Sequence, residues 1–430
     1  MKPLETSKGP VFHLWEYVVY WSIFVVFTFP VVLLGAVLRL FLGRTWSKTA
    51  PKPAEVKRLL LVQVENLGDF LISAGFNRAV RAAYPNAVIT ILVDSKFESF
   101  ISRFPYFDEV IGFNQSGGKA YRLFAGPLRA FQLAKRELWR RKFDLVLNQR
   151  WDTDSKHGAV LGMLALGRYH LGFSSKTNLR KRVINIGLDW LYSRVINPPL
   201  ELPYMVHDGL RGAQLLESLG LPPGGLLCEI FTTPEEEHFA EESLKDCTGL
   251  PLIVLGLGAT LARRQWPLER YAELATWILT ILPSAHFLVV GHAGDGRDGE
   301  TFRSALGSRL LNFGGKCSLG QSAALLRRAT LYFGTDSGPM HMCAAVGIPV
   351  VSFVVFPSNG PVDHPTSPFR YGAVGAPRAE VIYIPDYLPP CSYGCKASVA
   401  HCVTTITVEM AKAALVKVLD FPPSGDQRTL

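Results

Sequence analysis

Short continuous apolar runs alternate along most of the chain with longer segments of helical spacing. Such runs are typical of parallel strands that are buried on both faces. In the first half they predict strands at 58–64, 87–93, 109–113, 143–149 and 168–173. Strands that alternate with helices at this spacing predict a doubly wound parallel sheet, which places the chain in the α/β class.

A second series of the same kind follows the Gly/Pro-rich segment 221–225. Its predicted strands are 251–257, 286–291, 331–335 and 349–355. Its predicted helices are 267–282, 297–306, 319–329 and 337–346. The pattern thus predicts two Rossmann-like domains facing a cleft, with ligands outside the carboxyl ends of the strands. A last helix, near 406–419, is expected to pack back on the first half.

The N-terminal part of the chain contains a long uncharged segment, from Tyr17 to Leu38. A helix of about 22 residues is ~33 Å long, close to the ~30 Å hydrocarbon thickness of a bilayer. A signal peptide fits poorly, because the apolar run is too long and no A-x-A pattern follows it. Lysine and arginine dominate the residues after the run, which predicts a membrane anchor with the rest of the chain in the cytoplasm. Pro30 leaves two forms open, a kinked spanning helix and a hairpin that dips into one leaflet.

The domain boundaries follow from these patterns and from the Pro- and Lys-bearing linker. We expect a membrane anchor with its flanks at 1–45, a linker at 46–57, and two domains at 58–225 and 226–430. A length of 430 residues suits about two to three domains. The formal charge of +9 fits anionic lipid or phosphorylated substrates, and no signature of nucleic-acid binding accompanies it.

The turn after the first strand carries the first candidate for chemistry, in the order Asn66–Leu67–Gly68–Asp69. Gly68 permits a tight turn, and Asp69 falls at the start of the next helix. Asp69 is either a helix cap or a carboxylate that serves as a general base. The turn lacks G-x-G-x-x-G, which argues against a dinucleotide oxidoreductase.

The turn after the strand at 331–335 carries the second candidate. Asp336, Ser337 and Gly338 precede a helix that opens at Pro339. Small residues and the N–H groups of a helix start suit a diphosphate. An ordinary capped turn is the alternative, and His341 alone is also compatible with a core histidine.

A third stretch follows the strand at 251–257. Small residues up to Thr260 are followed by Arg263, Arg264 and Trp266–Pro267. An arginine here can neutralise phosphate charge with its forked donors, although a solvated basic loop has the same composition. Trp266 either supports a base or anchors the helix that begins at the proline.

Cysteines gather near the C-terminus, where Cys391, Cys395 and Cys402 accompany His401. The spacing can hold a zinc ion, but adjacent His401 and Cys402 are awkward ligands for one metal. We therefore expect a structural or free-thiol role for these cysteines and no metal site.

The three stretches, in this order, resemble glycosyltransferase family 9, the heptosyltransferase-like family of lipopolysaccharide assembly. The most specific match is Asp336–His341 with Ala344–Val351, which follows D-[ST]-G-P-M-H and A-A-x-G-x-P-V-V almost letter for letter. Weaker matches are the x-G-D turn with its Tyr-Pro end in 58–85, the strand Phe143–Leu147 and the helix start Trp266–Pro267. The resemblance runs from about Arg58 to Leu419.

This resemblance implies a GT-B fold with a donor site in the C-terminal half and an acceptor site in the N-terminal half. It implies inverting transfer without a metal, with Asp69 as the catalytic base. The implied donor-binding residues are Asp336, Ser337, Gly338, Met340, His341, Arg264 and Thr260. The acceptor-side candidates are Asn66, Arg150, Asp152 and Asp154, and the segment 367–370 is assigned to the donor side without a role.

Three departures from the family pattern leave the sugar open. Gln63 stands where the family usually has a basic residue, and Arg264 stands where it has a phosphate-binding lysine. Arginine keeps the charge but changes the geometry. The hydrophobic N-terminal segment is also unlike the soluble heptosyltransferases.

The sequence therefore predicts an inverting, metal-independent glycosyltransferase at the cytoplasmic face of the inner membrane. Its expected partners are a nucleotide-sugar donor, a lipid-linked glycan or lipopolysaccharide-type acceptor and the membrane, with no cofactor and no nucleic acid. A nucleotide-sugar epimerase is one alternative, against which the membrane segment speaks. A non-catalytic nucleotide-sugar-binding membrane protein is another, and it is disfavoured by the presence of Asp69.

Overall fold

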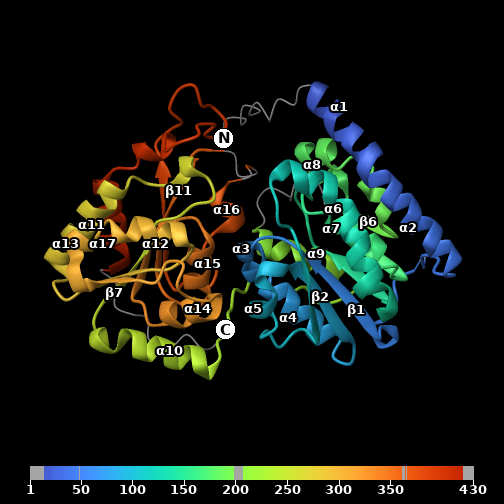
Figure 1. Ribbon diagram of the computed structural model, residues 1–430, viewed down its shortest axis with the longest axis horizontal. Helices are drawn as coiled ribbons and strands as arrows, with labels where there is room; N and C mark the ends of the chain where they lie inside the picture. The colour runs from blue at the N-terminus through green and yellow to red at the C-terminus, as the bar shows by residue number, and fades with distance from the viewer. Residues whose placement is uncertain (1–13, 48, 198–206, 361–363, 365, 420–430) are drawn as a thin grey trace. The chain divides into compact units, whose positions relative to one another are not determined.

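The computed structural model of the chain contains two compact α/β units, Met1–Leu226 and Leu227–Leu430 (Figure 1). The structure describes residues 14–47, 49–197, 207–360, 364 and 366–419.

The first unit is built on a six-stranded sheet with the strand order β3-β2-β1-β4-β5-β6, and all neighbouring strands are parallel. Its strands are β1 (Arg58–Gln63), β2 (Val88–Asp94), β3 (Glu109–Phe113), β4 (Leu145–Asn148), β5 (Tyr169–Phe173) and β6 (Arg194–Ile196). The sheet and the first five strands were expected from the apolar runs. The last strand was not, because three residues are too few to show a periodic pattern.

Helices cover both faces of this sheet. They are α3 (Leu67–Ile72), α4 (Ala74–Ala83), α5 (Glu98–Ile101), α6 (Lys119–Leu133), α7 (Gly158–Leu164), α8 (Leu179–Ile184) and α9 (Asp208–Ser218). Leu60 and Val62 of β1 share a core cluster with residues of α6 and α7. Their neighbours Leu59 and Leu61 point to the opposite face and are also fully buried. Burial on both faces explains why β1 reads as a continuous apolar run.

The N-terminal apolar segment forms one uninterrupted helical rod. It consists of α1 (Leu14–Ile23), a π-helical turn η1 (Phe24–Thr28) and α2 (Phe29–Phe41). Pro30 lies in the first turn of α2, and the wider π turn before it accommodates the missing backbone donor. The segment therefore does not reverse direction at Pro30, and the hairpin form is not adopted. The stretch Val18–Phe41, with a mean hydropathy of 2.4, is long and apolar enough to cross a membrane by length and composition.

The second unit repeats the architecture with the strand order β12-β11-β10-β7-β8-β9, again with all neighbouring strands parallel. Its strands are β7 (Leu252–Gly256), β8 (His286–Val289), β9 (Leu310–Asn312), β10 (Leu331–Thr335), β11 (Val350–Pro357) and β12 (Ala379–Ile384). The two edge strands, β9 and β12, were not expected. Alternation of buried and half-exposed positions along β12 explains why it lacks the apolar run of a central strand.

The helices of the second unit are α10 (Pro234–Leu244), α11 (Leu268–Ile281), α12 (Ala293–Glu300), α13 (Arg303–Leu306), α14 (Leu319–Arg327), α15 (Gly338–Ala345), α16 (Pro368–Tyr371) and α17 (Val408–Leu419). The helix expected at 297–306 begins earlier and is broken into α12 and α13.

The expectation that the last helix packs on the first half is wrong. Helix α17 packs against β11, β12 and α11 of the second unit. Ala411 and Leu415 are fully buried in the same core cluster as Ile253 of β7. The helix is amphipathic. Its apolar face packs on the sheet of the second unit, which is the sheet that directly precedes it in the sequence.

Candidate active site

Asp69 lies in the first turn of α3, directly after β1. Its Oδ2 accepts a hydrogen bond from the backbone N–H of Asn66 at 3.3 Å, so the carboxylate caps the helix start. Its Oδ1 lies 3.7 Å from Nη1 of Arg150. The side chain remains 23% exposed. One oxygen therefore has a structural partner, while the other lies beside a cation, and the side chain as a whole is partly accessible to solvent.

Glu65 is a second carboxylate at the same turn, and the sequence reasoning missed it. Its Oε2 lies 3.6 Å from Nη1 of Arg150, so Glu65 and Asp69 share one guanidinium. Burial raises the pKa of Glu65 to about 7, with Arg150 opposing the rise and Asp69 adding to it. Two carboxylates with different environments commonly divide the acid and base roles of a site. The feature of the sequence that could have pointed to Glu65 was its position, as a carboxylate immediately after a buried strand.

Lys156 adds a second cation to this cluster. Its Nζ donates to Oδ1 of Asn66 at 3.0 Å and lies 3.9 Å from Oδ2 of Asp94, at the end of β2. Burial lowers the pKa of Lys156, while Glu65 and Asp94 oppose the change. Asn66 is thus contacted by a partly buried lysine through its side chain and by Asp69 through its backbone N–H.

Two of the acceptor-side candidates, Asp152 and Asp154, are buried and engaged by their own loop. Asp154 accepts hydrogen bonds from the backbone N–H groups of Lys156, Gly158 and Ala159 at 3.2, 3.0 and 2.7 Å. Asp152 accepts from the backbone N–H of Thr153 at 2.6 Å. These contacts order the segment that carries Arg150, so both aspartates support the cluster indirectly.

Gln63, which replaces a basic residue of the family pattern, sits in a buried amide network. Its side-chain nitrogen donates to Asn77 at 2.6 Å and to Gln149 at 3.0 Å. Gln149 in turn donates to the hydroxyl of Ser73, and that hydroxyl donates to the backbone oxygen of Asp69 at 2.7 Å. A network of uncharged side chains therefore extends from β1 to the backbone of Asp69 in α3.

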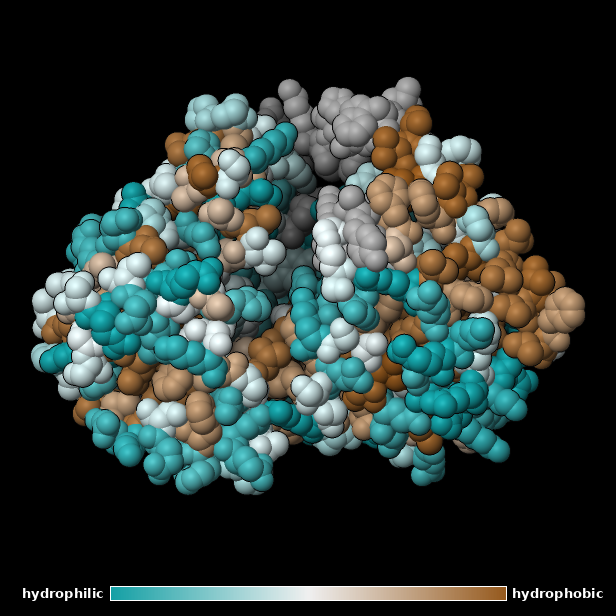
Figure 2. Space-filling view, in the orientation of Figure 1, coloured by the Kyte–Doolittle hydropathy of each residue, from teal (hydrophilic) through white to brown (hydrophobic). Residues whose placement is uncertain are grey.

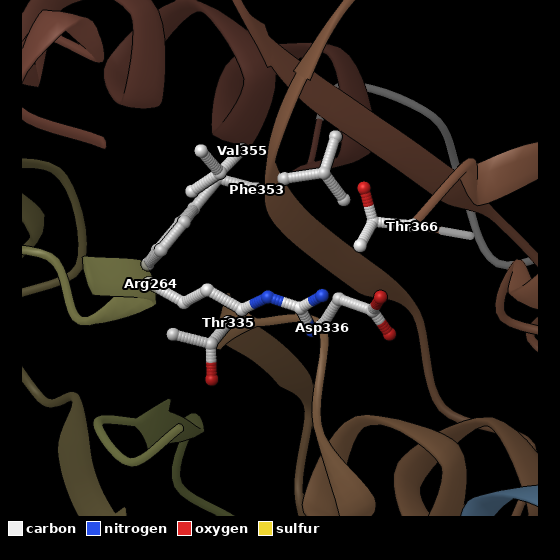
Figure 3. Close-up of a pocket in the computed structure, with 7 residues that line it drawn as sticks. Arg264, Thr335, Asp336, Phe353, Val355 and Thr366 are labelled. Carbon is white, nitrogen blue, oxygen red and sulfur yellow. The ribbon is translucent and has the colours of Figure 1, made fainter. Parts of the chain in front are cut away.

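In the second unit, a small pocket forms at the carboxyl ends of β10 and β11 (Figure 3). The residues that line it are Arg264, Thr335, Asp336, Phe353, Val354, Val355 and Thr366. The side chain of Arg264 extends across the pocket to the side chain of Asp336, whose carboxylate points away from the guanidinium, and Thr366 lies nearby (Figure 3). The pocket thus unites two stretches that the sequence placed more than about 70 residues apart.

Helix α15 begins at this pocket. Ser337 is the N-cap in an extended conformation, and Pro339 occupies the first turn. The first turn of a helix has no intrahelical partners for its N–H groups, and here Gly338 and Met340 supply such groups while Pro339 has none. His341 is buried, and its Nε2 lies 3.7 Å from Oδ1 of Asp336. The carboxylate of Asp336 thus lies beside the imidazole of His341, just before the start of α15.

Small residues let the turns after β7 and β10 approach each other. A Cβ on Gly334 would lie 2.4 Å from the backbone oxygen of Gly256, so a larger residue would separate the strands. The hydroxyl of Thr335 donates to the backbone oxygen of Gly258 at 2.6 Å and joins the two turns. Thr260, also a donor-side candidate, is exposed on the loop after β7 and does not line the pocket described above.

Trp266 is a buried anchor. It is 1% exposed, and its ring packs against Tyr271, Phe333 and Phe353. Its Nε1 donates to the backbone oxygen of Ile406 at 2.8 Å. Of the two interpretations of this tryptophan, anchoring of α11 is the one that its burial supports.

The C-terminal cysteines and His401 come together in space. The ligand atoms of Cys391, Cys395, His401 and Cys402 all lie within 4.8 Å of one another. This cluster belongs to the second unit and lies outside the pocket at Asp336.

Comparison with known proteins places these features in a family. Residues 132–368 match the sequence profile of glycosyltransferase family 9 (heptosyltransferase). The lipopolysaccharide core heptosyltransferase OpsX of Haemophilus influenzae is 21% identical over 302 residues, which is 70% of this chain and 79% of that protein. Lipopolysaccharide heptosyltransferase 2 of Salmonella typhimurium is 23% identical over 304 residues, with 69% and 82% covered.

Solved structures give the same result for the fold. The glycosyl transferase family 9 protein of Veillonella parvula has a TM-score of 0.65 at 21% identity, covering 84% of this chain and 97% of its own. The Escherichia coli heptosyltransferase WaaC with ADP has a TM-score of 0.59 at 19% identity, covering 84% and 99%. The fold of this chain is therefore GT-B. Since the matched profile covers more than half of its length, the chain belongs to glycosyltransferase family 9, the heptosyltransferase family.

Proposed function

We propose that this glycosyltransferase moves a heptose or a related sugar from a nucleotide diphosphate donor to a lipid-linked saccharide of the lipopolysaccharide type. The observation that carries the proposal is the pocket in the second unit, where Arg264, Asp336 and the start of α15 converge. The relatives named above are lipopolysaccharide heptosyltransferases. The solved WaaC holds ADP, so an ADP-linked sugar is the first donor to test.

In the proposed donor complex, the diphosphate lies against the N-terminus of α15. The N–H groups of Gly338 and Met340 and the positive end of the helix dipole favour an anion there. Arg264 adds a full charge and planar donors that match two phosphate oxygens. The carboxylate of Asp336 accepts hydrogen bonds from donor hydroxyl groups.

These groups account for transfer without a metal ion. The departing nucleoside diphosphate gains negative charge as the bond to the anomeric carbon breaks. Fixed amide dipoles and a guanidinium stabilise developing charge without reorganising. We therefore infer that Arg264 and the α15 amides serve in place of the divalent ion that many glycosyl donors require.

The acceptor hydroxyl is activated at the turn that carries Asp69. An inverting transfer is a single displacement, and the hydroxyl attacks well only when its proton is removed as the bond forms. Oδ1 of Asp69, which lies 3.7 Å from Nη1 of Arg150, is the candidate base. The pKa of Glu65 is raised to about 7, so Glu65 takes up a proton near neutral pH and becomes uncharged. The guanidinium of Arg150 then pairs with the carboxylate of Asp69 alone.

The N-terminal rod is proposed to attach the enzyme to the inner membrane from its cytoplasmic side, lying along the membrane surface. One flank packs on the first unit, because α1 contacts α8, and α2 contacts α6 and α7. Arg39 is buried and donates to the backbone oxygens of Gly167 and Met163 at 2.8 and 3.4 Å. A rod held to a globular unit at both ends suits an interfacial helix better than a spanning one.

The other flank of the rod is apolar and exposed. Figure 2 shows hydrophobic side chains gathered over α1 and α2. Leu40 and Phe41 are 71% and 85% exposed. Phe27 contacts Phe124 of α6 edge to face, with 4.9 Å between ring centres, and Phe124 and Leu128 extend the exposed apolar surface beyond the rod. A continuous surface of this kind marks a membrane or protein contact.

Labelling of a cysteine placed at Ser7 separates the two membrane arrangements. In intact cells, an impermeant maleimide should leave Ser7→Cys unlabelled and should label it after lysis, because an interfacial rod keeps both of its ends on one side. Labelling in intact cells would establish a spanning helix. Deletion of residues 1–44 should release the enzyme from membranes in either case.

A screen of nucleotide sugars tests the proposed function itself. A donor that binds the folded state raises the melting temperature by mass action, so an ADP-linked heptose should raise it and a lipid-linked core acceptor should then be extended. An epimerised free sugar nucleotide without transfer would favour an epimerase. The proposal fails if no nucleoside diphosphate sugar changes the melting temperature and no acceptor is extended.

A further inference from the structure

The loop between β12 and α17 gathers three thiols and one imidazole around a single point. Nδ1 of His401 lies 3.8 Å from Sγ of Cys391, 3.8 Å from Sγ of Cys395 and 3.3 Å from Sγ of Cys402. Cys395 and Cys402 are buried, and Cys391 is partly buried. The four side chains come from two short stretches separated by only a few residues.

Hydrogen bonding to the imidazole does not by itself explain why all three sulfurs approach the same ring nitrogen. A ring nitrogen donates or accepts along one direction, so Nδ1 satisfies at most one of the three sulfurs. Disulfide bonding does not explain it either, because all seven cysteines lie in the described part of the chain and are free thiols there. Some further partner at the centre of the four atoms would account for the arrangement.

The distances from Nδ1 of His401 to the three sulfurs match a tetrahedral metal site, and all four ligand atoms lie within 4.8 Å of one another. With metal–sulfur bonds of ~2.3 Å and metal–nitrogen bonds of ~2.0 Å, ideal tetrahedral angles place sulfur about 3.5 Å from nitrogen and about 3.8 Å from another sulfur. The observed nitrogen–sulfur distances of 3.3 to 3.8 Å bracket the first value. His401 and Cys402, although adjacent in sequence, both direct their ligand atoms to the centre, which removes the objection raised by their spacing.

The surroundings suit a closed structural site. The backbone N–H of Lys396 lies 3.5 Å from Sγ of Cys391 and donates to it, as amides near metal-bound thiolates do. Cys395 and Cys402 belong to the main core cluster of the second unit, and Tyr387 and Leu388 pack beside them. Four protein ligands in apolar surroundings leave no position for substrate.

We propose that Cys391, Cys395, His401 and Cys402 bind one thiolate-preferring transition-metal ion, zinc or ferrous iron, as a structural site. Three sulfurs and one imidazole nitrogen in tetrahedral array are the ligand set that these metals favour. The ion cross-links the loop that follows β12 to the short helix η11 (Cys402–Thr405).

The site would also brace the donor side of the unit. The backbone oxygens of Thr404 and Ile406, just after the ligands, accept hydrogen bonds from Arg270, and Ile406 also accepts from Trp266. Helix η11 contacts η9 (Ala262–Arg264). A metal ion that fixes His401 and Cys402 would therefore also fix the backbone oxygens of Thr404 and Ile406. These oxygens accept the hydrogen bonds from the side chains of Arg270 and Trp266.

Metal analysis of the purified full chain tests the site without reference to catalysis. Elemental analysis should find about one zinc or iron ion per chain, and its element decides between the two metals. Chains purified after growth in cobalt should show thiolate-to-cobalt charge-transfer bands and the visible bands of tetrahedral cobalt.

Variants connect that metal to the four residues. Cys395→Ser and His401→Ala should lose at least about four-fifths of the metal, whereas His401→Cys should retain it by supplying a fourth thiolate. Cys317→Ser is the matched control, because Cys317 is a partly buried cysteine elsewhere in the unit, and it should keep the full content.

Three results would overturn the proposal. The first is wild-type protein with neither metal nor cobalt bands. The second is a mass lower by two hydrogens, which would show that a disulfide joins two of the thiols. The third is full metal content in both Cys395→Ser and His401→Ala. If these variants do not fold, the metal content and the cobalt spectrum of the wild-type chain still decide.

Discussion

Replacement of Glu65 by glutamine should stabilise the first unit in alkaline solution but not in acid. Burial raises the pKa of this carboxyl from an ordinary 4.5 to about 7. Below pH ~4.5 the folded and unfolded states both hold the proton. As the pH rises through 7, the folded state must ionise a buried group that the unfolded chain has already ionised in water, so stability is lost over this interval. Glutamine has no such transition.

The size of the effect follows from the two pKa values. The interval between 4.5 and about 7 corresponds to roughly 3 kcal/mol, because each tenfold change in proton affinity is worth ~1.4 kcal/mol. For a unit of this length, 1 kcal/mol moves the melting temperature by ~2–4 °C. The advantage of the Glu65→Gln variant over wild type should therefore be up to roughly 6–12 °C greater at pH 8 than at pH 4.

Differential scanning calorimetry of the wild type and the variant at the two pH values measures this difference. Glu217→Gln is the control, because Glu217 is an exposed carboxylate on α9 of the same unit. It should change the melting temperature by the same small amount at both pH values. The reasoning is refuted if Glu65→Gln shows no greater advantage at pH 8 than at pH 4.

Further variants test the donor pocket, the core and the acceptor loop. Arg264→Gln should weaken nucleotide-sugar binding at least ~10-fold by calorimetric titration, since a charge-assisted hydrogen bond is worth ~1.5–3 kcal/mol; unchanged affinity would place Arg264 outside the site. Trp266→Ala should lower the free energy of unfolding of the second unit by ~3–5 kcal/mol in urea, and a loss below ~1 kcal/mol would contradict its anchoring role. Asp154→Ala should cost ~1–3 kcal/mol of stability, because it leaves backbone N–H groups without their acceptor, with little change in acceptor KM, whereas a raised KM at unchanged stability would make it an acceptor ligand. Transfer should continue when EDTA is added to the assay; loss of activity that Mg²⁺ restores would contradict the metal-free mechanism.

The central strands of both sheets were predictable because burial on both faces requires a continuous run of apolar residues. Strands such as β1 and β10 are continuous apolar runs, and a run of this kind has few other interpretations. Edge strands are different. Three-residue β6 and β9 are too short to show a period, and their pairing is decided by the neighbouring strand. The position of α17 likewise depends on which sheet face is uncovered, which a sequence pattern does not encode.

The candidate residues of the two units were predictable to different extents. Asp69 and Asp336 follow strand ends, where ligands bind in such sheets, so their positions in sequence pointed to them. Glu65 became a candidate only when the fold buried it beside Arg150, some 85 residues away in the chain. Lys156 joined the cluster in the same way. The electrostatic environment of a side chain depends on tertiary contacts. The sequence shows which charged residues are present but not which of them lie together.

Cys391, Cys395, His401 and Cys402 lie closer together than their spacing in the sequence suggested. Their spacing matched no standard zinc motif, and the adjacency of the last two argued against a shared metal. The backbone at His401, with φ of −139° and ψ of −91°, brings its ring and the sulfur of Cys402 to the same side. Spacing rules assume regular backbone between ligands, and this loop is irregular.

The account rests most directly on Asp69 as the base, and one comparison tests it: turnover and donor Kd for the wild type, Asp69→Asn and Glu65→Gln. Asparagine keeps the size of the side chain and its contact with the N–H of Asn66, but it does not take a proton at neutral pH. A positioned base contributes ~10²–10⁴-fold to the rate, so transfer by Asp69→Asn should fall at least ~100-fold with donor Kd nearly unchanged, and Glu65→Gln should lose less. Near-normal turnover of Asp69→Asn, or a larger loss in Glu65→Gln, would contradict the account.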